Sequence, residues 1–157
     1  MRVAVGGDHA GFEMKNLVAK HVESLGHSVV DAGAYEYDAL DDFPDFSEAV
    51  AVRVADGRAE RGLVVCGSGV GASVAANKVR GVRAGLCHDT YSARQGVEHD
   101  DMNVVCIGAR IIGEELAKEI VTAFLSARFI EDEEKYVRRL NKVLDIEGRN
   151  TRGDSES

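Results

Sequence analysis

Five short apolar segments alternate with helix-length segments along this chain of 157 residues, and this alternation restricts the possible folds most strongly. We predict strands at residues 3–5, 28–30, 63–66, 83–87 and 104–107. Strands separated by helices cannot pair as tight hairpins, so they form mostly parallel sheets covered by helices on both faces. The pattern therefore predicts an α/β fold: a three-layer α/β/α Rossmann-like sandwich around a five-stranded, mostly parallel sheet.

Apolar residues recur at helical spacing in the segments between and after these strands. Helices are expected at residues 12–25, 46–55, 72–78, 90–97, 114–127 and 133–146. The acidic and aromatic stretch 35–45 has no clear period, so we expect a loop, and its acidic run 38–45 is most simply a solvated surface. No strand follows the last helix, which we expect to pack outward as a dimer arm. We expect one domain over residues 1–147 and a disordered polar tail over residues 148–157.

The charge and cysteine content narrow the class of protein. The formal net charge is −8, which disfavours nucleic acid or an anionic membrane as the main partner, so any anionic ligand needs a local positive site. No apolar run approaches the ~20 residues of a membrane span, and no signal peptide pattern precedes the first strand. Cys66, Cys87 and Cys106 are widely spaced without a C-x-x-C motif, which indicates reduced thiols in a cytoplasmic protein.

The third predicted strand runs into a cysteine and then into alternating glycines, Cys-Gly-Ser-Gly-Val-Gly at residues 66–71. Parallel-sheet proteins bind ligands beyond the carboxyl ends of their strands, and glycines there let backbone N–H groups face an anion. This order predicts a thiol beside an anion-binding loop. Two other interpretations stay open: Cys66 is a small buried apolar residue, or the loop is a tight turn without a ligand. It is not the full dinucleotide fingerprint, because residue 72 is alanine, the spacing is wrong and no obvious ribose-binding acid ends the next strand.

Polar residues also accompany the other strands. Asp8 and His9 follow the first strand, Ser68 lies in the glycine loop, and Arg110 follows the fifth strand. Because the carboxyl ends of neighbouring parallel strands share one edge, we expect these residues to converge with Cys66. Asp8 is alternatively a helix cap.

His99 precedes the fifth strand. Within one subunit we therefore expect it at the opposite edge of the sheet. It can join the site only from a loop that wraps around, or from a partner subunit.

Taken together, these motifs resemble those of the ribose-5-phosphate isomerase type B family, in the superfamily that includes galactose-6-phosphate isomerase. The resemblance covers about residues 1–147 and rests on the segments 5–12 (VGGDHAGF), 66–71 (CGSGVG), 75–78 (AANK), 81–84 (GVRA), 91–93 (YSA), 99–100 (HD), 103–104 (NV) and 108–110 (GAR). It implies interconversion of an aldose phosphate and a ketose phosphate without a metal or organic cofactor. It also implies a homodimer, or a tetramer built from such dimers, with active sites shared between subunits.

The resemblance further implies a role for each matching residue. It implies that Cys66 is the base that moves a proton between carbons 1 and 2; Ala72 stands where other members carry a glutamate for this role. The resemblance further implies that Ser68 assists at the sugar oxygens and that the backbone of Gly67, Gly69, Val70 and Gly71 forms an anion hole for the enediolate. Ring opening is implied for Asp8 and for His99 of the other subunit. The implied substrate contacts are phosphate or sugar contacts by His9 and Arg110, a sugar contact by Asp100, and phosphate binding by Lys135 and Arg139.

The chain departs from the family pattern at the substrate end of the site. Asp100 stands where asparagine is usual, and an ionised aspartate only accepts hydrogen bonds. Lys135-Tyr136 replaces an arginine–histidine pair, so the bidentate fork to phosphate is lost. We expect ribose 5-phosphate and ribulose 5-phosphate as the substrate pair. The alternatives are another sugar phosphate (of galactose, allose or a tetrose) and a non-catalytic module that binds a phosphate ligand.

Overall fold

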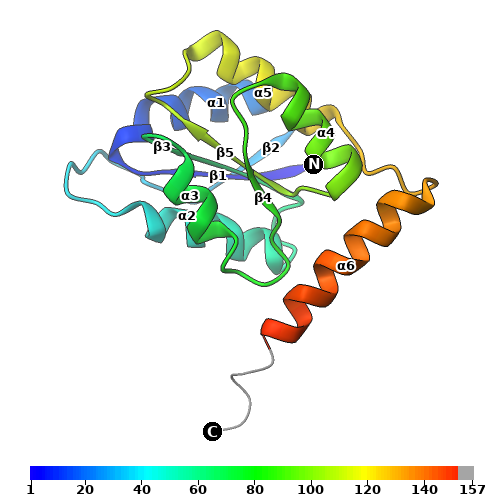
Figure 1. Ribbon diagram of the computed structural model, residues 1–157. Coiled ribbons are helices and arrows are strands. Elements are labelled where there is room, and N and C mark those ends of the chain that lie inside the picture. The colour runs from blue at the N-terminus through cyan, green and yellow to red at the C-terminus, as the bar shows by residue number, and fades with distance from the viewer. Residues whose placement is uncertain (152–157) are drawn as a thin grey trace, which may run out of the picture.

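A five-stranded parallel sheet forms the centre of the computed structural model, which describes residues 1–151 (Figure 1). The strand order is β2-β1-β3-β5-β4, and all the pairings are parallel. The predicted α/β sandwich is therefore confirmed. The strands are β1 (Arg2–Gly7), β2 (Ser28–Asp31), β3 (Arg61–Cys66), β4 (Ala84–Leu86) and β5 (Val104–Gly108).

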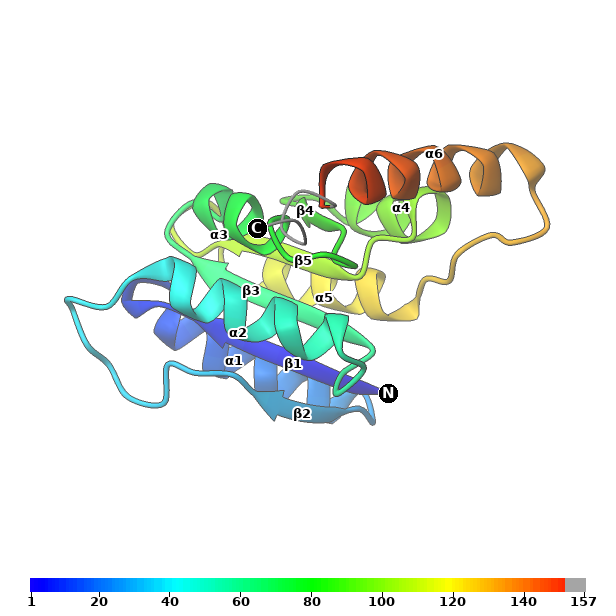
Figure 2. The same ribbon diagram turned by 90° about the horizontal axis from the view of Figure 1, so that it is seen from below.

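Helices cover both faces of the sheet (Figure 2). One face carries α1 (Phe12–Ser24), α4 (Thr90–Asp100) and α5 (Glu114–Ser126), and the other carries α2 (Phe43–Ala55) and α3 (Val70–Ala76). A short 3-10 turn, η1 (His9–Gly11), joins β1 to α1, and α6 (Glu134–Asn150) lies beside α4 as the predicted extra C-terminal helix. No helix among residues 1–151 is long and apolar enough to cross a membrane.

Side chains alternate between the two faces along each strand, because the side-chain period of a strand is two residues. In β3, Leu63 and Val65 pack under α1, α4 and α5, whereas Val64 and Cys66 pack toward α2 and α3. All four are at most 5% exposed. Cys66 is the last residue of its strand, so its backbone is anchored in the sheet while its side chain reaches the carboxyl edge.

The order of the strands opens a crevice between β1 and β3. From β1 the chain passes through α1 to β2 on one side, and the later strands all lie on the other side. The connections that leave β1 and β3 therefore go to helices on opposite faces of the sheet, α1 and α3. Open parallel sheets bind ligands at such a reversal of strand order, beyond the carboxyl ends of the strands.

Several helix boundaries differ from the sequence-based expectation by two residues or more. Helix α4, expected to end at residue 97, continues to Asp100 and so contains His99. Helix α2 begins at Phe43 rather than at residue 46, because Pro44 occupies its first turn, where a missing N–H costs nothing. Helix α3 begins at Val70, directly after Gly69, and ends at Ala76. Helix α6 continues to Asn150, so residues 148–150 of the expected tail are helical. Residues 152–157 of that expected tail lie outside the described part of the chain.

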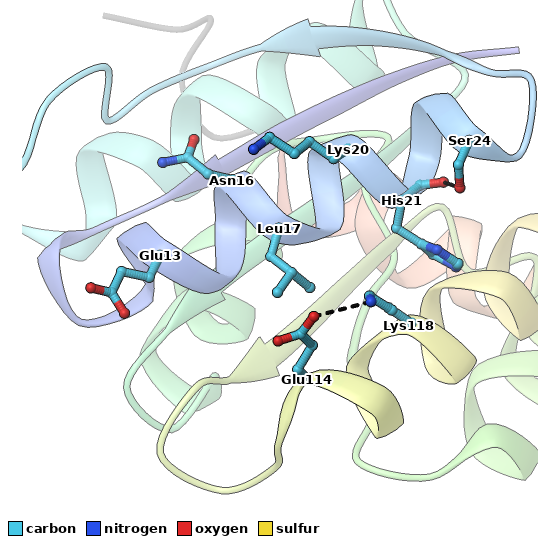
Figure 3. A pocket seen from close by; sticks show the side chains of 8 residues that line it. All are labelled: Glu13, Asn16, Leu17, Lys20, His21, Ser24, Glu114 and Lys118. Carbon is cyan, nitrogen blue, oxygen red and sulfur yellow. Dashed lines mark hydrogen bonds and ion pairs between the residues drawn. The ribbon is translucent and has the colours of Figure 1, made fainter.

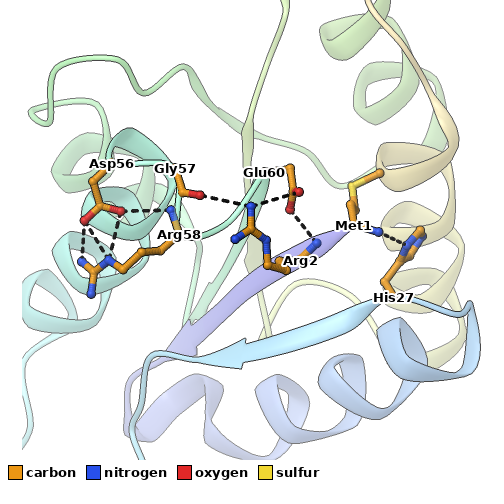
Figure 4. Close-up of polar contacts among 7 residues, drawn as sticks. All are labelled: Met1, Arg2, His27, Asp56, Gly57, Arg58 and Glu60. Atoms are coloured by element: carbon orange, nitrogen blue, oxygen red, sulfur yellow. Dashed lines mark hydrogen bonds and ion pairs between the residues drawn. The ribbon is translucent and has the colours of Figure 1, made fainter.

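The opposite edge of the sheet, where the strands begin, carries exposed polar contacts (Figure 4). The Arg2 backbone N–H donates to Glu60 Oε2 at 2.6 Å, and its guanidinium donates to the Gly57 carbonyl oxygen and to Glu60 Oε1, each at 3.2 Å. The Met1 amino group lies 3.2 Å from His27 Nδ1. Exposed ion pairs of this kind contribute little to stability, so this edge joins β1 to its neighbours without the buried polar groups of a site.

One buried cation supports the carboxyl edge instead. The Lys15 side chain is 1% exposed, and its Nζ lies 2.8 Å from Asp31 Oδ1 and donates to the Ala34 carbonyl oxygen at 3.0 Å. Asp31 is 47% exposed, so water solvates it on one side. Lys15 therefore depends on Asp31 to compensate its charge, whereas water can solvate the Asp31 carboxylate without Lys15.

We predict that Asp31→Asn destabilises the fold more than Lys15→Met. The Asn variant leaves a buried charge uncompensated, which costs about 3 kcal/mol. The Met variant leaves a solvated carboxylate and one unpaired carbonyl, at about 1 to 2 kcal/mol. Urea unfolding measures both, with Asp56→Asn as a control, because its exposed pair with Arg58 contributes little to stability. A larger loss for Lys15→Met would contradict this account of the pair.

Candidate active site

A cavity of about 370 Å³ opens where β1, β3 and β5 end. Its lining residues come from the end of β3, from the segments that follow β1, β3 and β5, and from the start of α2. Its lining residues are Asp8, His9, Ala10, Phe43, Cys66, Gly67, Ser68, Gly71, Arg110 and Ile111. The expected convergence of Asp8, His9, Cys66, Ser68 and Arg110 on one edge is thus present in the structure.

Backbone geometry brings an N–H group to the Cys66 sulfur. The N–H of Gly69 donates to Cys66 Sγ at 3.2 Å, and the N–H of Val70 donates to Ser68 Oγ at 3.3 Å. Gly69 has a φ of 79°, a conformation that glycine adopts without strain. A Cβ at this position would also lie 2.5 Å from Leu86 Cδ1. The loop therefore requires glycine here, and the turn directs the Gly69 N–H at the Cys66 sulfur.

The other two thiols lie deep in the protein. Burial raises the pKa of Cys87 to about 11, with a further contribution from nearby Asp89. Burial also raises the pKa of Cys106 far above its ordinary range. The expectation that both are buried is confirmed. Cys66 is only 5% exposed but lines the cavity, so burial and access to a ligand coexist at this residue.

The turn after β1 holds two of the predicted polar residues. Asp8 is 6% exposed, and its Oδ1 accepts from the Gly11 N–H at 3.0 Å, so it does cap the 3-10 turn. This cap does not remove it from the cavity wall. His9 follows, and Asp41 accepts hydrogen bonds both from its backbone N–H, at 2.9 Å, and from its Nδ1, at 2.7 Å. This bond to Asp41, together with the charge of Asp8, raises the pKa of His9.

Arg110 reaches the cavity because the chain after β5 runs beside the glycine loop. The N–H of Ala109 donates to the Cys66 carbonyl oxygen at 2.8 Å, and the N–H of Arg110 donates to the Gly67 carbonyl oxygen at 3.0 Å. Backbone hydrogen bonds between these two segments thus continue just beyond the ends of β3 and β5. Arg110 supplies positive charge to the cavity wall, and His9, whose pKa is raised, adds to it when protonated, against the carboxylate of Asp8.

Six predicted residues do not line this cavity. Gly69 and Val70 belong to the same loop, and their N–H groups donate to Cys66 Sγ and Ser68 Oγ, which do line the cavity. The other four lie on α4 and α6: His99, Asp100, Lys135 and Arg139. His99 lies near the end of α4, just before β5 begins, which agrees with the expectation that one subunit places it at the opposite edge.

A second cluster of predicted residues forms around His99. Its ring stacks on that of Tyr136 with centroids 4.1 Å apart and an interplanar angle of 13°. Its Nδ1 lies 2.8 Å from Gln95 Nε2, and Lys135 Nζ lies 5.0 Å from the Tyr136 ring centroid. Asp100 is exposed and lines a different groove, between α6 and the segment that includes Arg83. The predicted site is therefore divided into two parts within one chain.

Sequence reasoning missed several residues of the cavity. Phe43 and Ile111 supply apolar wall, and the Phe43 ring packs so closely on Gly71 that a Cβ there would lie 2.6 Å from Cζ. Pro44 was the available signal, because it marks a first helical turn and thus brings Phe43 into a helix. No local signal identified Asp41, since its partner His9 is 32 residues away.

The carboxylate and imidazole groups near this turn also have the composition of a metal site. Asp8, His9 and Asp41 each offer one ligand atom, and these three atoms lie within 4.8 Å of one another. The hydrogen bonds described above already join these residues to each other and to the Gly11 N–H. We therefore interpret the group as an ion pair beside a capping carboxylate, and assign it no metal.

A larger hollow, of about 500 Å³, lies between α1 and α5 (Figure 3). Lys118, one of the two lysines that line it, is paired with Glu114 at 3.0 Å, and His21 Nε2 lies 2.8 Å from Thr122 Oγ1. Figure 3 shows Leu17 between the two helices and neither a thiol nor a glycine loop. The hollow therefore lacks the combination of nucleophile and N–H donors found at the carboxyl edge.

Comparison with known proteins identifies relatives along nearly the whole chain. The model of the Ribose/Galactose Isomerase family matches residues 3–143. The chain is 38% identical over 148 residues to ribose-5-phosphate isomerase B of Escherichia coli (strain K12), covering 94% of this chain and 97% of that protein. It is 40% identical over 132 residues to D-erythrulose-4-phosphate isomerase of Pectobacterium atrosepticum, covering 82% and 85%. The solved ribose-5-phosphate isomerase B of Clostridium thermocellum superposes with a TM-score of 0.91 at 38% identity, covering 96% and 100%.

We predict that iodoacetamide modifies Cys66 in the native protein and spares Cys87 and Cys106. The pKa of Cys87, raised to about 11, keeps its thiol protonated at neutral pH, and the pKa of Cys106 is raised further. Alkylation requires the thiolate. Peptide mass mapping after treatment near neutral pH measures the sites, and a urea-unfolded sample, in which all three react, is the control. Modification of Cys87 before Cys66 would contradict this assignment.

Proposed function

The chain belongs to the ribose/galactose isomerase family and is an aldose–ketose isomerase of a sugar phosphate, and on this premise we propose that it interconverts ribose 5-phosphate and ribulose 5-phosphate. The observation that carries the proposal is the cavity in which Cys66, a glycine-loop N–H and two cationic side chains meet. The thiol suits proton transfer at carbon, the N–H donors suit a developing oxyanion, and the cations suit a phosphate ester.

In the proposed reaction Cys66, as thiolate, removes the proton from carbon 2 of the open-chain aldose. The C–H electron pair becomes the carbon 1–carbon 2 double bond, and the carbonyl electrons move to oxygen 1. Return of the proton to carbon 1, with transfer of the hydroxyl proton from oxygen 2 to oxygen 1, gives the ketose. Ser68, exposed in the same loop, is placed to exchange that hydroxyl proton.

Backbone N–H groups stabilise the enediolate in this scheme. The groups of Gly67, Gly69, Val70 and Gly71 belong to one rigid turn, and donors aimed where charge develops contribute about 3 kcal/mol each to transition-state stabilisation. The turn is held by the bond from Gly69 N–H to sulfur and by the pairing of residues 66–67 with 109–110. The turn is therefore fixed before substrate binds, and in this scheme the Gly69 and Val70 N–H groups exchange their bonds to Cys66 Sγ and Ser68 Oγ for bonds to the enediolate.

The remaining walls suit ring opening and phosphate binding. Asp8 is a buried carboxylate next to the cavity, placed to take a proton from a sugar hydroxyl when the furanose opens. His9 and Arg110 bind phosphate or sugar oxygens as cations. In a chain of net charge −8 they provide the local positive site that an anionic substrate needs.

We further propose that two copies of the chain share each active site. His99, Lys135 and Arg139 lie outside the cavity of their own chain, and α6 has no buried residue. Val143, Leu144 and Ile146 are 39–52% exposed on α6, which is unusual for a helix with such apolar residues. A homodimer that covers this surface brings His99 of one copy to the cavity of the other, where it completes ring opening. Lys135 and Arg139 then bind the phosphate.

One observation supports a second candidate substrate. The relative that acts on D-erythrulose 4-phosphate is as similar to this chain as the ribose-5-phosphate isomerases are. Lys135 binds phosphate as a point charge where a bidentate group would fix its distance from carbon 1. A shorter or longer sugar phosphate is therefore the alternative substrate, and a panel of tetrose, pentose and hexose phosphates distinguishes them.

We predict that Cys66→Ala lowers kcat by about 10³-fold while the fold is kept, because a general base contributes about 10² to 10⁴. The measurement is turnover on that panel together with loss of deuterium from carbon 2 of the aldose phosphate. Cys87→Ala is the matched control and keeps activity. Near-normal turnover of Cys66→Ala would rule out this base, and a wild type that binds sugar phosphates without exchange would be a binding module instead.

A second prediction tests the shared site. Cys66→Ala and His99→Ala are each inactive, but a mixture that exchanges subunits contains one intact site in each mixed dimer. Activity then recovers to about a quarter of the wild-type value, because half the dimers are mixed and half their sites are intact. Size-exclusion chromatography and turnover before and after mixing measure this. Mixing without recovery, although subunits exchange, would place His99 in its own chain's site.

A further inference from the structure

The acidic loop that connects β2 to α2 contributes one residue to the turn after β1. Asp41 is 10% exposed at its side chain, and its Oδ1 accepts from both the His9 backbone N–H and His9 Nδ1, at 2.9 and 2.7 Å. Its Oδ2 is fully buried and has no hydrogen-bond partner in the described part of the chain. The loop itself is ordered by turns, with the Asp38 carboxylate accepting from the Leu40 N–H at 2.9 Å. Asp41 is thus directed inward by the loop, unlike its solvated acidic neighbours.

This arrangement leaves one nitrogen of the imidazole free for a ligand. Nδ1 is occupied by Asp41, so Nε2 is the atom through which His9 meets the cavity that it lines. A carboxylate bound to one nitrogen sets the ring orientation and determines which nitrogen carries the proton. The buried and otherwise unpaired Asp41 carboxylate also requires a nearby positive charge, since an isolated charge is costly to bury. His9 is the cation in contact with it.

We infer that Asp41 is a positioning residue of the isomerase: through Nδ1 it holds His9 in its cationic form, so that Nε2–H remains a donor to the anionic substrate. The inference rests on the proposed function only for the identity of that substrate. It makes the charge of the cavity depend on this pair, since Arg110 is the other cation that lines the cavity and Asp8 is a carboxylate.

Other charged and titratable groups surround His9, and they do not replace Asp41. Asp8 precedes it on the same turn and raises its pKa less than the hydrogen bond to Asp41 does. His9 also lines a neighbouring hollow of about 360 Å³, together with Glu13 and Tyr37. The groups that face His9 are therefore Asp8, Glu13, Tyr37, Asp41, Cys66 and Arg110, and of these Asp41 alone is hydrogen-bonded to the imidazole.

The sign of the pH dependence follows from this contact. The pKa of His9 is raised above its ordinary value of 6.5. The His9–Asp41 pair therefore stabilises the fold fully below pH 6.5 and loses this contribution as the pH rises through the raised value. Substrate affinity falls over the same interval, because neutral His9 attracts the phosphate less. A variant that removes the Asp41 charge moves this loss to lower pH.

The test is Asp41→Asn, which removes the charge but keeps an oxygen that accepts from the His9 N–H. NMR of the five histidines follows the His9 ring, assigned from its absence in His9→Gln. We expect the His9 titration midpoint to fall by about one pH unit. Asp42→Asn is the matched control: it makes the same charge change at the adjacent, exposed residue, and leaves the midpoint unchanged.

Kinetics provide the second readout. The ratio of KM for Asp41→Asn to KM for wild type is near one at about pH 5.5, where both proteins hold His9 cationic, and rises to about tenfold at about pH 8.5 with kcat within about twofold. This ratio cancels the ionisation of the substrate phosphate and of Cys66. A loop anchor without an electrostatic role would change stability but leave the ratio constant with pH.

Two results would overturn the inference: equal His9 midpoints in the Asp41 and Asp42 variants, or a KM ratio that does not change with pH. A wild type that turns over no sugar phosphate in the panel would overturn the proposed function instead. The NMR comparison, which needs no substrate, would still decide whether Asp41 holds the charge of His9.

Discussion

Parallel pairing of β1, β3 and β5 is the constraint on which the rest of the structure depends. Parallel strands end at one edge, so each connection that follows a strand begins beside its neighbours. The strand register places these ends side by side, because Gly7 pairs with Val65 and Cys66 pairs with Gly108. The turn with Asp8 and His9, the thiol loop and the Arg110 segment therefore start from adjacent positions, and the reversal of strand order between β1 and β3 separates the helices that follow.

The chemistry of the cavity depends on how little each group can move. Cys66 is held at the end of a buried strand, Gly69 is in a left-handed conformation, and the backbone of residues 66–67 pairs with residues 109–110. His9 is held by two bonds to Asp41. Donors and charges fixed by packing stabilise developing charge without reorganisation. A strongly acidic chain thereby builds a locally cationic cavity from two basic side chains and a turn of N–H groups.

Four residues of the expected site, those on α4 and α6, lie apart from the cavity of their own chain, and the fold accounts for this division. Helix α4 runs antiparallel to the strands, so His99 near its end lies where β5 begins, away from Cys66. The stacked pair of His99 and Tyr136 then joins α6 to α4. In the proposed homodimer, a second copy brings one edge of the sheet to the other.

Local sequence determined much of this protein by itself. The alternation of apolar strands and helical segments predicted the sandwich, and placing Asp8, His9, Cys66, Ser68 and Arg110 directly after strands predicted their convergence, because parallel topology converts strand ends into a shared edge. The start of α2 was missed, although Pro44 marked it. Tertiary structure alone decided that Phe43 packs on Gly71 and that one of several similar aspartates, Asp41, turns inward to His9. The physical reason is range: periodicity and turn chemistry act over a few residues, whereas a contact between residues 32 positions apart depends on how a whole loop folds back onto the sheet.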